Sequence, residues 1–133
     1  MQLAKYIFIF AVYCVVPPVQ AEYPWDLMKK QEFKSAYMNA LGPKFGEKWI
    51  SKLSGPSEAA VNVTIDGEKY ILASSCKQHA CDTDNLVIAF GISTKKAYVK
   101  LRESSGNINI YGGPSASVLS ELNAFYEMRF ANN

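Results

Sequence analysis

Apolar residues recur every three or four positions near the start of the chain and again near its end, whereas the middle alternates with a period of two. Pro24 suits the first turn of a helix, and Gly42-Pro43 is a stop signal. We therefore expect one helix over residues 24–41. Its apolar positions share one face and comprise Trp25, Met28, Phe33, Tyr37, Ala40 and Leu41.

A second, shorter helical turn is predicted for residues 45–53, before Gly55-Pro56 ends it. The spacing i, i+4, i+8 buries Phe45, Trp49 and Leu53. Aromatic residues at helical spacing are far more typical of a core than of a sugar-binding surface. We therefore expect both aromatic rings to be core residues.

A closing helix is predicted after Gly112-Gly113-Pro114, with Ser115 or Ser117 as its cap. A serine hydroxyl at this position can accept a hydrogen bond from a backbone amide of the first turn. The apolar stripe that follows is wide enough to pack on a sheet, and it contains Val118, Leu119, Leu122, Phe125, Tyr126 and Phe130.

The middle of the chain predicts a β-sheet. Asp66-Gly67 is a hairpin signal between two alternating segments, and the later connections are also short. Short connections favour antiparallel pairing between neighbours. The predicted fold is α+β, with about five antiparallel strands and the helices from both ends of the chain packed on the sheet. The predicted strands are residues 60–65, 68–73, 86–92, 97–101 and 108–111.

Residues 1–21 have the pattern of a secretory signal peptide. Lys5 precedes an apolar run of about eleven residues, and Val19-Gln20-Ala21 is a cleavage pattern. The run is well short of the roughly 20 residues that span a bilayer. We expect cleavage after Ala21, which leaves residues 22–133 as a single domain in the periplasm.

The charge pattern excludes two classes of partner. The formal net charge is +2 for the whole chain, and the charges are interspersed, with no basic run longer than two residues. A nucleic-acid-binding or membrane-surface protein usually concentrates its basic residues. We therefore expect neither nucleic acid nor membrane as a partner.

The three cysteines predict one disulfide. Cys14 lies in the predicted signal, so the exported chain keeps Cys76 and Cys81, and an exported pair is usually oxidised. Closing a six-residue ring stabilises a protein by about 2 kcal/mol in the loop-entropy model. This modest value indicates that the bond mainly shapes the loop between the two residues, the cysteine loop (residues 76–81).

Three interpretations of the cysteine loop remain open, and each involves His79, the only histidine. A ring closed by a disulfide loses little entropy on docking, so His79 near its tip could enter a partner's cleft and bridge two acidic groups. Metal binding by Cys76, His79, Cys81 and Asp82 is disfavoured, because one residue between His79 and Cys81 strains a tetrahedral site. In the third interpretation the bond only orders a hairpin turn, and His79 is an ordinary surface residue.

An enzymatic function is not expected. No nucleophile elbow or Ser-x-x-Lys pattern accompanies the histidine, and the cysteines lack the C-x-x-C spacing of a redox motif. We also expect no cofactor and no metal.

The segment from Val61 to about Leu101 resembles the Ivy family of bacterial periplasmic inhibitors of vertebrate, c-type lysozyme. That family carries a C-K-P-H-D-C loop after a strand, and this chain has Cys76-Lys77-Gln78-His79-Ala80-Cys81. The strand with Gly67, Glu68 and Tyr70 and the apolar strand from Leu86 are also similar.

The resemblance implies that the loop enters the lysozyme cleft with His79 between the two catalytic carboxylates. Cys76 and Cys81 would preform the loop, and Lys77, Gln78 and Ala80 would be flanking contacts. It also implies a protein-binding module, in a family that includes homodimers.

Two residues depart from the family pattern. Gln78 replaces proline, which frees φ and adds an ordering cost of about 1 kcal/mol. Ala80 replaces aspartate, which removes a negative group from a surface that should face a basic lysozyme. The alternative is therefore a divergent envelope protein that binds a lytic transglycosylase, or no muramidase at all, with a purely structural loop.

Overall fold

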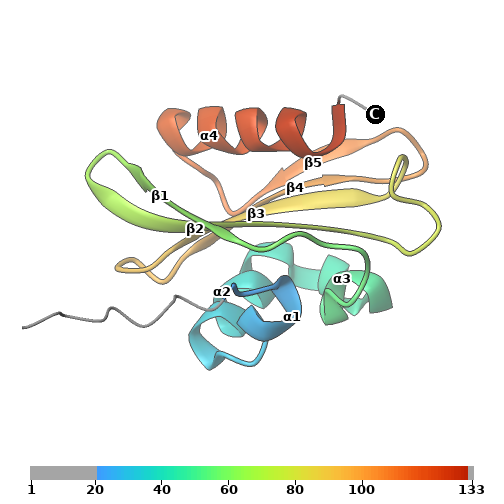
Figure 1. The fold of residues 1–133 in the computed structure, drawn as a ribbon, viewed down its shortest axis with the longest axis horizontal. Helices are drawn as coiled ribbons and strands as arrows, with labels where there is room; N and C mark the ends of the chain where they lie inside the picture. The colour runs from blue at the N-terminus through green and yellow to red at the C-terminus, as the bar shows by residue number, and fades with distance from the viewer. Residues whose placement is uncertain (1–20, 132–133) are drawn as a thin grey trace, which may run out of the picture.

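The computed structural model describes residues 21–131, in which five strands form one antiparallel sheet (Figure 1). The spatial order of the strands is the same as their order in the chain, so each strand pairs with its sequence neighbours. The predicted α+β class and antiparallel sheet are confirmed. The strands are β1 (Val61–Ile65), β2 (Glu68–Cys76), β3 (Asn85–Gly91), β4 (Ala97–Arg102) and β5 (Ile108–Tyr111).

The helices cover both faces of the sheet (Figure 1). Because side chains alternate along a strand, β3 directs Leu86, Ile88 and Phe90 into one core and Val87 and Ala89 into the other. The first core lies under α1 (Pro24–Leu27), α2 (Gln31–Leu41), the 3₁₀ helix η1 (Gly42–Gly46) and α3 (Lys48–Lys52). The second lies under α4 (Ala116–Tyr126) and the π-helical turn η2 (Glu127–Ala131).

The expectation of one continuous helix over residues 24–41 is wrong, because the helix is interrupted at residues 28–30. Leu27 and Phe33 both lie in the first core. Six residues turn an ideal helix through about 600°, which would place Phe33 about 120° around the axis from Leu27. The interruption lets both side chains face the sheet, whereas Trp25 stays exposed.

The expected burial of Phe45 and Trp49 is only partly correct. Both rings pack against the first core but keep part of their surface exposed, and the fully buried residues of this region are Ile50 and Leu53. The change from a 3₁₀ helix to α3 rotates the chain between Phe45 and Trp49, so the continuous helical spacing does not apply.

The closing helix matches its prediction. Ser115 is the cap, and its hydroxyl accepts a hydrogen bond from the Val118 amide at 3.3 Å. The predicted stripe faces the second core, with Leu122 fully buried. The exception is Leu119, which is partly buried and does not belong to that core.

Strand β2 runs three residues beyond its predicted end at Ala73 and pairs as far as Cys76 opposite Asn85. This extension carries the first cysteine to the end of the sheet. The predicted signal peptide lies outside the described residues, except for Ala21. Between residues 21 and 131 no helix is both long and apolar enough to cross a membrane.

Candidate functional site

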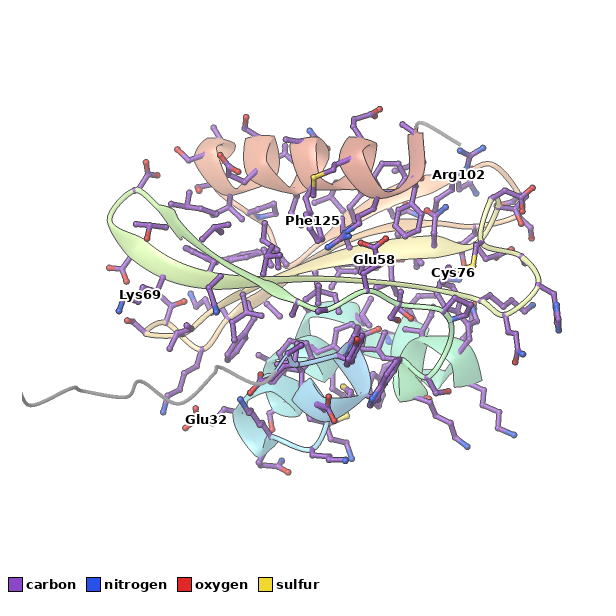
Figure 2. All side chains as sticks on the ribbon, in the orientation of Figure 1. Glu32, Glu58, Lys69, Cys76, Arg102 and Phe125 are labelled. Atoms are coloured by element: carbon purple, nitrogen blue, oxygen red, sulfur yellow. A yellow bond between two sulfur atoms is a disulfide. The ribbon has the colours of Figure 1, made fainter. Side chains whose placement is uncertain are left out.

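The cysteine loop projects from the end of β2. Cys76 and Cys81 form the predicted disulfide, with 4.9 Å between their Cα atoms. Cys76 is the buried last residue of β2, and Figure 2 shows it at the opposite end of the molecule from Lys69. The ring is therefore anchored to the sheet through Cys76.

A tight turn places His79 at the tip of the ring. The Ala80 amide donates to the Lys77 carbonyl at 3.0 Å, and His79 has a φ of 66°. Positive φ at the third residue alone is the pattern of a type II turn, in which Gln78 occupies the position that favours proline. Histidine tolerates this left-handed conformation better than most non-glycine residues.

Further hydrogen bonds fix the base of the loop. The Lys77 amide donates to the Asp84 carbonyl at 3.0 Å, and the Asp84 amide donates to the Ala80 carbonyl at 2.8 Å. The buried Asp84 carboxylate accepts from the Thr83 hydroxyl at 3.0 Å and from the Ser104 amide at 3.2 Å. Because Ser104 follows β4, the loop is also tied to the β4–β5 turn.

Lys77, Gln78 and His79 are exposed, whereas Ala80 is partly buried. The structure thus brings the four predicted partner-binding residues together on one turn. Both cysteine sulfurs are in the disulfide, which removes the two thiolates that a metal site would need.

A groove of about 650 Å³ separates the cysteine loop from α3, and we call it the α3 groove. Lys77, Gln78 and His79 form one wall. Three residues on the other side were not predicted as site residues: Lys48, Trp49 and Lys52. The spacing i, i+4 of the two lysines beside a tryptophan was the available signal.

The segment after α3 packs directly against the ring. A β-carbon on Gly55 would collide with the Cys76 carbonyl oxygen, so only glycine fits here without a shift. The Ser57 and Ser75 hydroxyl oxygens are 3.0 Å apart and share a hydrogen bond.

The same segment also contacts the C-terminal turn η2, where Arg129 forms an ion pair with Glu58. Burial lowers the pKa of Arg129.

Lys44 links the start of α3 to the β4–β5 turn. Its ammonium forms ion pairs with Glu103 and with Glu47, the latter at 2.9 Å. Hydrogen bonds to Glu103 first, and then to Glu47, raise the pKa of Lys44 above its usual value. Glu47, the acidic residue at the edge of the α3 groove, is thus engaged by Lys44.

Comparisons with known proteins give one consistent result. A family model described as inhibitor of vertebrate lysozyme (Ivy) matches residues 32–125, which include all five strands and the cysteine loop. A protein from Pseudomonas aeruginosa named "Inhibitor of vertebrate lysozyme" is 33% identical over 85 residues, which are 61% of this chain and 56% of that protein. The chain therefore matches little more than half the length of this relative.

Proposed function

Because the chain belongs to the Ivy family of inhibitors of vertebrate lysozyme, we propose that it inhibits a c-type lysozyme by inserting the cysteine loop into the enzyme's cleft. The observation that carries the proposal is the position of His79. It is exposed at the tip of a ring that a disulfide closes and that backbone hydrogen bonds hold at its base. A preorganised loop loses little entropy when it docks.

The proposed mechanism follows from the chemistry of both partners. Glycoside hydrolysis by a lysozyme requires two carboxyl groups, one of which acts as the acid. An imidazole offers a nitrogen on each side of its ring, so it can contact both groups at once and exclude the substrate. Lys77, Gln78 and Ala80 would contact the cleft beside His79, while Cys76 and Cys81 keep the turn closed.

The second candidate is inhibition of another peptidoglycan-cleaving enzyme, such as a lytic transglycosylase of the same cell. The observation that favours it is the chemistry around the loop. Ala80 lacks a negative charge, and Lys48, Lys52 and Lys77 surround the α3 groove, which is a poor match for a basic lysozyme. For either target we propose that the protein acts in the periplasm after export, as a monomer or homodimer without a cofactor.

Titration against a c-type lysozyme in a cell-wall lysis assay tests the proposal. His79→Asn is the sharpest variant, because asparagine tolerates the same left-handed backbone but lacks the imidazole. We expect this variant to lose inhibition while its unfolding free energy stays within about 0.5 kcal/mol of the wild-type value.

His79→Ala serves as the second variant, and we expect it to lose inhibition as well. If His79→Asn inhibits as strongly as wild type, the loop mechanism is wrong. If wild type does not inhibit the c-type lysozyme but inhibits a lytic transglycosylase in a His79-dependent manner, the second candidate replaces the first.

A further inference from the structure

The α3 groove borders the proposed inhibitory loop. Lys77, Gln78 and His79 line it, so a partner that receives His79 in its cleft must cover the groove with the adjoining part of its own surface. The volume of about 650 Å³ is sufficient for several side chains. Any contact made here adds to the contact made by the loop.

The groove carries positive charge that the described part of the chain does not neutralise. Lys48, Lys52 and Lys77 are exposed, and within residues 21–131 none of them is in an ion pair. The nearby carboxylate of Glu47 is already paired with Lys44. A surface of this kind attracts carboxylates and repels basic groups.

Trp49 supplies an apolar contact between the lysines. Its ring packs against the first core, remains partly exposed and lines the groove. Tryptophan is enriched among the residues that dominate binding energy at protein interfaces, because it offers a large and rigid surface. Trp49 therefore has the character of an interface anchor.

The groove is also preformed. Gly55 lies against the Cys76 carbonyl, and the Lys77 amide donates to the Asp84 carbonyl, so direct contacts join the segment after α3 to the end of β2 and close the base of the loop. A partner would meet a fixed shape, which keeps the entropic cost of binding low.

We propose that the α3 groove is a second contact surface for the inhibited enzyme, and that it receives a lip of the enzyme's cleft that carries carboxylates. This inference rests on the proposed function. It assigns specificity to the groove: enzymes with an acidic lip beside the catalytic carboxylates bind well, and enzymes with a basic lip do not.

Charge reversal tests the proposal in the full-length protein. Binding to the c-type lysozyme, or to the lytic transglycosylase if that is the enzyme inhibited, is measured by calorimetry at low and high salt. We expect Lys48→Glu and Lys52→Glu each to weaken binding by about threefold to tenfold and to reduce its salt dependence. The matched control is Lys69→Glu, which makes the same charge change at the opposite end of the molecule (Figure 2).

A second measurement reports on the groove directly. The chain has two tryptophans, so protein labelled with 5-fluorotryptophan gives two fluorine resonances, which Trp49→Phe assigns. We expect the Trp49 resonance to shift when unlabelled enzyme is added. Trp25 stacks on Tyr23 and does not line the groove, so its resonance should not move and is the internal control.

The outcomes separate this inference from the proposed function. If the charge reversals bind as wild type, or if the Trp49 resonance does not move, the groove is not the proposed contact. The loop mechanism still stands in that case, provided that His79→Asn abolishes binding. Stronger binding by Lys48→Glu or Lys52→Glu shows a basic lip and also overturns the inference. If the wild-type protein binds neither enzyme, both proposals fail.

Discussion

His79 adopts the left-handed backbone region without being a glycine, with a φ of 66°. Such a conformation costs on the order of 1 kcal/mol and persists only where the surroundings impose it. Here the disulfide and the hydrogen bond from Ala80 to Lys77 impose it. The sequence could predict the ring and the histidine, because both are local, but the backbone conformation results from the turn that the ring encloses.

Gln78→Pro tests the order of the turn. Gln78 occupies the turn position that proline prefers, and within residues 21–131 its amide donates no backbone hydrogen bond. We expect the variant to raise the unfolding free energy by about 0.5 to 1 kcal/mol, because proline restricts the unfolded chain. The inhibition constant should fall about twofold to fivefold, because proline orders the turn before the loop binds its target.

Gln78→Ala is the control for Gln78→Pro, since it removes the same side chain without adding a ring. A proline variant that is less stable than the alanine variant would contradict the assigned turn. Thermal unfolding and the lysis assay are sufficient for both comparisons.

Tyr37→Phe tests the buried hydroxyl of α2. The Tyr37 hydroxyl donates to the Ile50 carbonyl at 2.7 Å, and burial raises the pKa of Tyr37 well above 10.0. The folded state therefore keeps this proton at a pH where the unfolded state loses it. Above pH 10, this residue should lower the unfolding free energy by about 1.4 kcal/mol per pH unit.

Lys44 and Tyr70 also have raised pKa values, so they too lower the unfolding free energy at alkaline pH. The informative quantity is therefore the difference in unfolding free energy between wild type and Tyr37→Phe at each pH. Near neutral pH, Tyr37→Phe should cost about 1 kcal/mol, because the Ile50 carbonyl loses its donor. Denaturant unfolding from pH 8 to 11 should show a shallower decline for the variant. An equal decline would mean that Tyr37 ionises in the folded state.

At the scale of elements, the sequence predicted the strands well because their apolar alternation and turns are local signals. The interruption between α1 and α2 was missed, since it depends on where Leu27 and Phe33 must meet the sheet. The α3 groove was missed because it also depends on tertiary packing. Trp49 has the spacing of a core residue, and the sequence does not show that α3 lies beside the cysteine loop with part of the Trp49 ring exposed in the groove between them.

Gly55→Ala tests the contact between the segment after α3 and the end of β2. The new methyl group would meet the Cys76 carbonyl oxygen, which cannot rotate away. We expect a loss of about 1 to 3 kcal/mol in unfolding free energy, together with weaker inhibition, because the base of the loop must shift. Urea unfolding and the lysis assay measure the two effects.

Gly46→Ala is the matched control, because apart from its chain neighbours and its own helix backbone nothing lies within 4 Å of the added methyl group. It should be neutral or slightly stabilising. Equal losses in the two variants would contradict the assigned contact between Gly55 and Cys76.

At the scale of the whole molecule, the disulfide should matter less for stability than for inhibition. Cys76→Ser combined with Cys81→Ser should cost about 2 kcal/mol in unfolding free energy, which the cores on both faces of the sheet can tolerate. Inhibition should fall more than tenfold, since the exposed turn must then be ordered on binding. A reducing agent added to the wild-type protein should reproduce both changes.

Calorimetric unfolding and the lysis assay at 25 °C separate the two effects. A double variant that inhibits normally would show that hydrogen bonds alone keep the turn in shape, and the disulfide would then have no part in the proposed mechanism.

The agreement between strand order and chain order bears on how the protein is made. A chain that becomes available from its N-terminus onward can pair each new strand with the strand before it, so within the sheet no strand has to wait for a distant partner. Helix α4 and Arg129 come last, and their docking brings Arg129 to Glu58, in the segment that packs beside the ring. The contact between Arg129 and the segment beside the ring therefore becomes available only once the last described element has been made.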